Sequence, residues 1–249
     1  MENFQTLSRR KALGLVGAAT ALPFFPVSAK AATAPVLVEL FTSQGCSSCP
    51  PADKFAARLK SMPGVHVASL NVDYWDYLGW HDTLAKPEYT QRQMDYAHDR
   101  GDNEVYTPQM VVNGAWRAVG SNSSAVESLI EKARARQPVA DVSLAVDDME
   151  VTITLGNGAA VPEATLWLMA IAPHVEVRIE RGENTGSTIA YSNVVRNLVP
   201  AGMWKGKSCV IKLPRKGIFT ADCKSCLAVL QRGKVGPVLG IASWGDTSA

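Results

Sequence analysis

The feature that most constrains this chain is a pair of cysteines, Cys46 and Cys49, between an apolar segment and a predicted helix. Residues 36–41 have the length and character of a buried strand, and Gly45 permits a tight turn after it. Two prolines follow Cys49, which suits a first helical turn because no backbone donor is needed there. One apolar helix face is then predicted from Phe55, Ala56, Leu59 and Met62.

This position favours a redox-active dithiol. A thiolate is the nucleophile in disulfide exchange, and a helix N-terminus stabilises its charge. We expect Cys46 to be the more exposed and more acidic thiol, and Cys49 to resolve a mixed disulfide formed on Cys46. A permanent structural disulfide is one alternative. A metal site is another, either zinc shared with Cys223 and Cys226 or copper, but no histidine lies at a telling position, so neither a metal nor another cofactor is expected.

Composition limits the class of protein. The chain has 249 residues, of which 47% are hydrophobic and 19% charged, as in an ordinary globular protein. A net charge of +2 gives no indication of nucleic-acid binding. Five cysteines are an odd number, so an exported form has at least one sulfur outside stable pairs.

Residues 1–31 predict an export signal. A basic start, residues 8–11, precedes an apolar stretch, and Ala29-Lys30-Ala31 is a small-residue cleavage site. Arg9 and Arg10 resemble a twin-arginine signal, while an ordinary secretory signal and an uncleaved membrane helix are the alternatives. We expect a periplasmic or secreted protein that does not associate with the membrane after cleavage and in which disulfides persist.

Further along the chain, three strands and two helices complete the first half. Residues 65–72 predict a strand parallel to the first, and residues 86–100 a helix. Asn113-Gly114 predicts a hairpin whose first strand is opened by Pro108. A capping box at Ser124 starts a last helix, which ends before Pro138.

The second half is predicted to be all β. Seven short strands are expected, with a domain boundary near Gln137, and their number and turns favour an antiparallel sandwich. The expected strands are residues 142–146, 151–155, 165–172, 175–179, 208–213, 227–231 and 238–244.

The element order, with Cys46, Cys49, Thr107 and Pro108, resembles the thioredoxin superfamily over residues 35–137. That resemblance implies that Pro108 is a cis proline facing the cysteines and that Thr107 contacts the substrate main chain. A second resemblance rests on the sequence of residues 39–53 and on the segments Asp-Tyr-Trp, Tyr-Thr-Pro-Gln-Met-Val-Val and Arg-Gly-Glu-Asn. In these segments the chain more closely resembles a family of secreted bacterial proteins known as domain of unknown function 1223. This family implies a fold but no settled activity, and the Ser-Ser between the cysteines leaves the redox poise open.

Several residues have two interpretations. Glu39 is either a proton acceptor for Cys49, with its pKa raised by burial, or a member of an ion pair at a sheet margin. The aromatic segment at residues 74–80 is expected to be mostly packed, with Trp75 as the candidate for substrate contact. Cys209 is expected to pair with Cys223 or Cys226, and residues 181–184 are interpreted as a structural loop rather than a binding element.

The predicted fold is therefore an α/β thioredoxin-like domain, residues 32–137, followed by an antiparallel β-sandwich domain, residues 138–249. The predicted function is an exported thiol–disulfide oxidoreductase acting on protein or peptide thiols and disulfides. Cys46 would attack, Cys49 resolve and Glu39 move the proton, while Thr107, Pro108 and Trp75 would bind substrate. The alternative is a thioredoxin-fold binding module with a permanent disulfide and no turnover. An exposed, acidic Cys46 favours the enzyme, and a buried, unreactive one favours the module.

Overall fold

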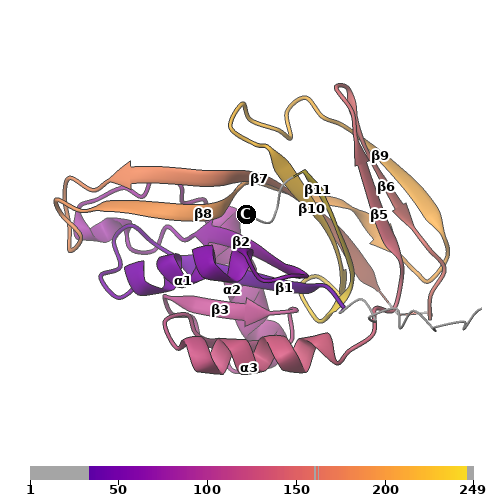
Figure 1. Cartoon of the computed structure of the whole chain (residues 1–249), viewed down its shortest axis with the longest axis horizontal. Coiled ribbons are helices and arrows are strands. Elements are labelled where there is room, and N and C mark those ends of the chain that lie inside the picture. Colours follow the sequence, from indigo (N-terminus) through magenta and orange to yellow (C-terminus); the bar gives the residue numbers. More distant parts are fainter. Residues whose placement is uncertain (1–33, 160, 162, 246–249) are drawn as a thin grey trace, which may run out of the picture. The chain divides into compact units, whose positions relative to one another are not determined.

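An eight-stranded mixed sheet is the centre of the computed structural model, which describes residues 34–159, 161 and 163–245. The strand order is β11-β10-β7-β8-β2-β1-β3-β4, and the described residues belong to one compact unit (Figure 1). The expected export signal and its cleavage site lie outside the described residues. The strands are β1 (Val36–Thr42), β2 (Val65–Asn71), β3 (Gln109–Val112), β4 (Trp116–Val119), β7 (Ala164–Arg178), β8 (Thr188–Trp204), β10 (Ser225–Arg232) and β11 (Val238–Gly245).

The first half of the chain supplies the part of the sheet that leads to the cysteines. β1 pairs in parallel with β2 and antiparallel with β3, and β3 forms a hairpin with β4. The predicted Asn-Gly turn is confirmed, because Asn113 and Gly114 both have positive φ. The predicted helix at residues 86–100 is also confirmed as α2 (Pro87–Arg100).

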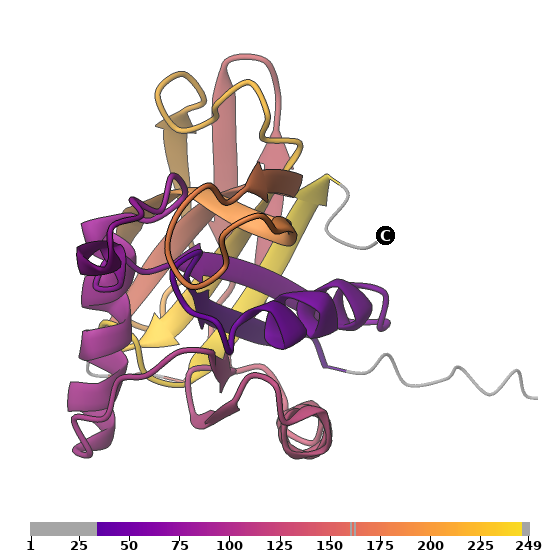
Figure 2. The same ribbon diagram turned by 90° about the vertical axis from the view of Figure 1, so that its left-hand side faces the viewer.

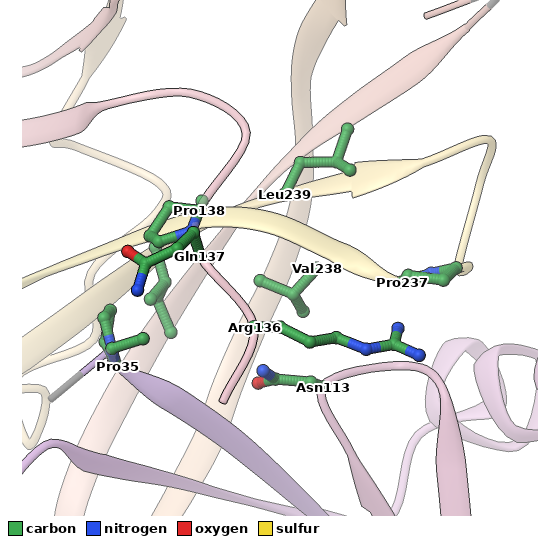
Figure 3. Close-up of a pocket in the computed structure, with 11 residues that line it drawn as sticks. Pro35, Asn113, Arg136, Gln137, Pro138, Pro237, Val238 and Leu239 are labelled. Carbon is green, nitrogen blue, oxygen red and sulfur yellow. The ribbon is translucent and has the colours of Figure 1, made fainter. Parts of the chain in front are cut away.

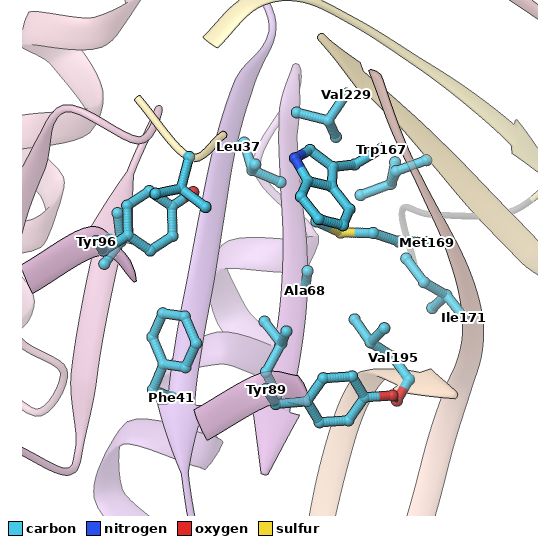
Figure 4. Packing of buried hydrophobic residues seen from close by; sticks show 14 of the residues in the cluster. Leu37, Phe41, Ala68, Tyr89, Tyr96, Trp167, Met169, Ile171, Val195 and Val229 are labelled. Carbon is cyan, nitrogen blue, oxygen red and sulfur yellow. The ribbon is translucent and has the colours of Figure 1, made fainter. Parts of the chain in front are cut away.

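Helices cover both faces of this part of the sheet. Along β1, Val36, Val38 and Leu40 pack with α1 (Pro50–Lys60) and α3 (Ser123–Arg134), while Leu37 and Phe41 share a core with Tyr89 and Tyr96 of α2 (Figure 4). Alternate side chains of a strand point to opposite faces, so α2 lies across the sheet from α1 and α3. The cap of α3 is Asn122 rather than Ser124, since the Asn122 side chain accepts a hydrogen bond from the Ala125 N–H at 3.2 Å.

The second half differs from the predicted separate sandwich. Its strands β7, β8, β10 and β11 join the large sheet, with Val194 of β8 paired in parallel to Ser69 of β2. Only β5 (Val142–Val146), β6 (Glu150–Leu155) and β9 (Cys209–Pro214) form a second, three-stranded sheet. The small sheet shares a buried core with the large one, but the large sheet continues across residue 137, so the separate sandwich expected for residues 138–249 is not confirmed.

The physical reason is that β7 is apolar on both faces. Leu166, Leu168 and Ala170 belong to the core shared with the small sheet, whereas Trp167, Met169 and Ile171 belong to the core shared with α2. A strand that buries both faces belongs inside a covered sheet rather than in one side of a sandwich. The two segments predicted at residues 165–172 and 175–179 are one strand, because the pairing of β7 with β8 continues from Ala172 to Arg178.

β8 was not predicted from the sequence. Its residues include Asn193, whose φ is 50°, and Pro200 and Gly202, which weaken the strand signal. The register between β7 and β8 shifts at Leu166/Trp167, opposite Gly202 and Pro200, and again at Ala170/Ile171. The long β7–β8 hairpin reaches past the large core, and its end lies beside the start of α1 (Figures 1 and 2).

Candidate functional site

Cys46 and Cys49 form a disulfide at the start of α1, with their Cα atoms 5.4 Å apart. β1 ends at Thr42, a short turn follows, and Cys49 is the N-cap of α1. Its carbonyl accepts from the N–H groups of Ala52 and Asp53 at 2.8 and 3.1 Å. The strand, turn and helix predicted around the cysteines are thus confirmed.

The expected exposure of Cys46 is wrong for the oxidised protein, because the relative exposure of Cys46 and of Cys49 is 0%. Ser47 and Ser48 between them are exposed. The Ser48 hydroxyl lies 3.4 Å from Cys46 Sγ and is the donor, since a disulfide sulfur carries no proton. The N-terminal position of Cys46 therefore does not by itself make it accessible, because other segments cover it.

One covering segment is the loop between β7 and β8, residues 179–187, here called the cover loop. The Asn184 side chain donates from Nδ2 to the carbonyls of Gln44 and Cys46, at 2.9 and 3.0 Å. Glu183 Oε2 accepts from the Ser47 N–H at 3.3 Å. Residues 181–184, interpreted from sequence as a structural loop, thus contact the turn that carries the disulfide directly.

The other wall is formed by the aromatic segment and the loop before β3. The Thr107–Pro108 peptide bond is cis, as the resemblance implied. Trp75 Nε1 donates to Thr107 Oγ1 at 2.8 Å, and a Cβ on Gly45 would lie 3.1 Å from Trp75 Cβ, so glycine is needed for this close approach. A Cβ on Gly120 would lie 3.1 Å from Ala52 Cβ and 3.2 Å from Pro108 Cβ, which places Pro108 next to α1.

These contacts gather most of the predicted site. Cys46, Cys49, Trp75, Thr107 and Pro108 surround the start of α1. Of the other aromatic residues, Tyr74 and Trp80 are partly buried and Tyr77 is 79% exposed, as expected for a mostly packed segment.

A buried carboxyl group, Asp53, lies one helical turn after Cys49. Its Oδ1 accepts from the Thr42 hydroxyl at 2.9 Å, and its Oδ2 has no hydrogen-bond partner among the described residues. Burial raises the pKa of Asp53 to about 8, only partly opposed by the Thr42 hydrogen bond. Because residues i and i+4 share a helix face, Asp53 lies on the side of α1 that carries Cys49.

A second buried acid, Asp82, holds the turn in place. Its Oδ2 accepts from the Gln44 N–H at 2.7 Å and from Asn71 Nδ2 at 2.9 Å, and burial raises its pKa. Trp80 Nε1 donates to Gln44 Oε1 at 2.8 Å. Gln44 is thus fixed from several directions, which sets the path of the chain into Cys46.

Glu39 does not join this site. It lies on the opposite face of β1, where its carboxylate pairs with Arg92 of α2 at 2.6 Å and accepts from the Tyr96 hydroxyl. Arg92 Nη2 also donates to Gln231 of β10 at 2.6 Å. Of the two interpretations, the structure favours the ion pair, although it lies in the interior between β1, α2 and β10 rather than at a sheet margin.

The predicted disulfide of the second half is absent, because Cys209, Cys223 and Cys226 are free. Cys209 begins β9 in the small sheet, whereas Cys226 lies on β10 in the large one, so these two belong to different layers. Burial raises the pKa of Cys226 to about 12, which makes it a poor nucleophile.

Hollows elsewhere are small or open. A cavity of about 30 Å³ between Pro35, Asn113 and Pro237 has room for little more than a water molecule (Figure 3). A groove of about 270 Å³ lies beside the start of α1, lined by Pro50 and Lys54 of α1 and by residues 187–190. Among the described residues, no three His, Cys, Asp or Glu side chains gather as a metal site would require. Within the same residues, no helix has the length and hydrophobicity to cross a membrane.

Sequence reasoning missed Asp53, Glu183 and Asn184. Asp53 had a signal, since it follows Cys49 by four residues and alternates with apolar residues on the buried face of a predicted helix. Glu183 and Asn184 stood out only as part of the Arg-Gly-Glu-Asn segment of the family resemblance. Their contacts with Ser47 and Cys46 depend on the hairpin of β7 with the unpredicted β8.

Comparisons with known proteins identify a family but no activity. A family described as "Protein of unknown function (DUF1223)" matches residues 37–231. The crystal structure of protein AGR_C_4864 from Agrobacterium tumefaciens is similar, with 30% sequence identity and a TM-score of 0.73, covering 86% of this chain and 95% of that chain. HBP35 of Porphyromonas gingivalis, 15% identical, matches with a TM-score of 0.62 over 86% of this chain and 75% of its own, which shows a shared fold alone. No curated protein matches.

Proposed function

Since the chain belongs to the DUF1223 family, whose description names no activity, we propose its function from the site: an exported thiol–disulfide oxidoreductase acting on protein or peptide partners through Cys46 and Cys49. The observation that carries the proposal is a disulfide at a helix start with a buried carboxyl group, Asp53, one turn behind it. A purely structural disulfide has no need of such a group, whose burial is unfavourable when it is charged.

The finer assignment of the fold supports the same proposal. From β1 through α1, β2, α2, β3 and β4 to α3, the order of elements is that of a thioredoxin-like domain, and the Thr107–Pro108 bond is cis. We extend the proposal to the compartment: the expected export signal would deliver the chain to the periplasm or beyond, where a disulfide persists.

The proposed exchange starts from the reduced pair. The Cys46 thiolate attacks one sulfur of a partner disulfide, that S–S bond breaks, and the second partner sulfur leaves as a thiolate and takes a proton from solvent. Cys49 then loses its proton and attacks Cys46 Sγ. The mixed disulfide breaks, the first partner sulfur leaves as a thiolate that takes up a proton, and the Cys46–Cys49 bond forms. Two electrons have passed to the partner, which leaves as a dithiol. The reverse sequence oxidises a partner dithiol, and both use the same residues.

Asp53 replaces Glu39 as the proposed proton acceptor for Cys49. A carboxyl with a pKa of about 8 is close in proton affinity to a thiol, so a proton can pass between them with little energetic cost. Its free Oδ2 provides the site for that proton, while Oδ1 stays with Thr42. Ser48 is placed to donate a hydrogen bond to Cys46 when it becomes a thiolate.

The second candidate is a binding module with a permanent disulfide. One observation favours it: neither sulfur is exposed in the oxidised protein. This candidate gives Asp53 no role and requires that neither cysteine exchange with a partner, so the two functions differ in a measurable outcome.

Cysteine variants distinguish them. Cys49→Ser should trap partners in a mixed disulfide on Cys46, released by added thiol, because the resolving thiol is gone. Cys46→Ser is the matched control and should trap few or none. Asp53→Asn in the otherwise native protein should trap transiently and slow the resolution by Cys49 by about tenfold or more. If Cys49→Ser and Cys46→Ser trap equally little, the oxidoreductase is wrong and the binding module is supported.

A further inference from the structure

The cover loop has two buried residues, Ile179 at its start and Asn184 near its middle. Residues 180–183 and 185–187 are exposed, whereas Asn184 is 8% exposed. Its Nδ2 group donates both of its hydrogens to main-chain carbonyls, those of Gln44 and Cys46. These carbonyls belong to the turn between β1 and α1, here called the redox turn. An amide that turns away from its own exposed loop to bind another segment ties the two segments together.

The neighbouring Glu183 acts on the same turn. Its carboxylate accepts from the Ser47 N–H, a donor of the kind that would otherwise face a thiolate on Cys46. A carboxylate in this position competes with that thiolate for the donor and repels it as a like charge. The loop therefore both covers the pair and makes its surroundings less favourable to the reactive form.

The exposed part of the loop is internally organised and is attached to Ile179, whose side chain is buried with Leu84 and Tyr191. Gly186 N–H donates to the Ile179 carbonyl at 2.8 Å, and Ile179 N–H donates to the Ser187 carbonyl at 2.9 Å. Thr185 bonds back to the Gly182 carbonyl through both its N–H and its hydroxyl. Glu183 and Asn184 supply the hydrogen bonds that join it to the redox turn, so displacement breaks those bonds and keeps the internal ones.

We propose that the cover loop is a displaceable guard, and that the partner which displaces it is an extended polypeptide with an acidic side chain. This inference rests on the proposed function. The groove at the loop's end carries the argument for the partner: residues 187–190 form one side and Pro50 and Lys54 of α1 the other. A segment in that groove contacts both the loop and the helix that begins at Cys49, and the exposed Lys54 ammonium complements an acidic group on the partner.

The guard discriminates between small thiols and polypeptide partners by the contact area that each can form with the groove. A small thiol gains no contact with the groove that offsets loss of the Asn184 and Glu183 hydrogen bonds. A polypeptide replaces those bonds with contacts of its own while its sulfur reaches Cys46. The loop thus protects the pair from small thiols and admits docked partners.

Loop variants test the guard. Oxidised Asn184→Ala should be reduced by dithiothreitol about tenfold faster than wild type, because two buried hydrogen bonds are lost. Glu183→Gln should increase the reduction rate less, because the hydrogen bond from the Ser47 N–H weakens without being lost. Arg181→Ala, in the same loop, is the matched control and should leave the rate unchanged. Rates come from acid quench, alkylation and mass spectrometry, with thermal melts to show intact folding.

The partner is tested with a synthetic dithiol peptide bearing acidic residues and its lysine counterpart. The acidic peptide should reduce wild type at least about tenfold faster than the lysine one, and Lys54→Glu should reverse that order. Equal rates for the two peptides overturn the partner assignment. If folded Asn184→Ala is reduced by dithiothreitol at the wild-type rate, the guard is overturned.

If Asn184→Ala does not fold, amide hydrogen exchange of the unaltered loop still tests the guard. Amides of residues 180–187 should exchange hydrogen faster in a Cys49→Ser mixed disulfide with the acidic peptide than in the oxidised wild type. Unchanged exchange contradicts displacement. Trapping by Cys49→Ser with equal rates in all loop variants leaves the proposed function standing without the guard. Faster reduction of Asn184→Ala without any trapping leaves the guard without the enzyme.

Discussion

Two buried carboxyl groups, Glu39 and Asp53, have opposite surroundings on the two sides of β1. Glu39 meets the guanidinium of Arg92 and the hydroxyl of Tyr96. Asp53 meets one hydroxyl, from Thr42, and no cation within hydrogen-bond distance among the described residues. Burial without a neighbouring cation raises the pKa of Asp53 to about 8. The difference teaches that the first group is structural and the second is suited to accept and release a proton.

The Glu39 side ties distant parts of the chain together. Arg92 stacks over the rings of Tyr96 and Trp167, each 5.2 Å from its guanidinium carbon, and reaches Gln231 of β10. Gln231 in turn donates to the Tyr96 hydroxyl at 2.8 Å. This network crosses the boundary predicted near Gln137, so its loss should affect the whole described unit.

The largest expected effect is on stability, from Arg92→Met. Removing the guanidinium leaves Glu39 buried without a cation and should cost about 3–5 kcal/mol in the free energy of unfolding. Urea denaturation measures it. The double variant Glu39→Leu/Arg92→Met removes both charges and should lose less than the single variant. If Arg92→Met lowers the free energy of unfolding by less than about 1 kcal/mol, the ion pair does not stabilise the protein as expected.

The next effect concerns Asp53 and pH. Its folded pKa, about 8, lies above the ordinary 3.8, so the folded state binds a proton more tightly than the unfolded state. Stability contributed by that proton is therefore complete below pH about 4 and is lost as pH rises to about 8. Relative to Asp53→Asn, the wild type should lose more than about 1.4 kcal/mol across that window, since the shift exceeds one pKa unit. Parallel pH profiles for the two proteins would contradict the raised pKa, and Glu39→Gln provides the comparison for a carboxylate held by a cation.

The smallest effect concerns the wall beside the cysteine turn where Trp75 meets Thr107. Trp75→Phe keeps the ring packing but removes the Nε1 donor to Thr107, which should cost about 1 kcal/mol in stability. The Cys46–Cys49 chemistry should persist, with weaker partner docking seen as faster release of the Cys49→Ser complex. A stability loss as large as that of Arg92→Met would mean that this wall, rather than the ion pair, holds the molecule together.

Local signals predicted the half of the fold in which elements follow each other closely. The turn at Asn113, the helix at residues 87–100 and the cis Pro108 all follow from short patterns or from resemblance. The membership of β7 and β8 in the large sheet did not, because pairing between residues far apart in sequence leaves no local pattern. The irregular β8, with positive φ at Asn193, also hid its strand character.

The candidate site divides in the same way. The cysteines, Thr107, Pro108 and Trp75 were found from sequence, and the structure brings them together. Glu39 was tied to the cysteines by proximity along β1, although strand alternation directs it to the α2 side. Asp53 was accessible to helix periodicity, whereas the cover of Cys46 by Asn184 required the tertiary structure.

The most direct test of the central claim is the reduction potential of the Cys46–Cys49 pair, measured by equilibrating the protein in thiol–disulfide buffers and counting alkylated cysteines by mass. The double variant Cys46→Ser/Cys49→Ser gives the background from the other three thiols. A working pair should lie between about −270 and −120 mV, the range of dithiol exchange proteins. A potential below about −300 mV, typical of structural disulfides, would contradict the oxidoreductase and favour the binding module.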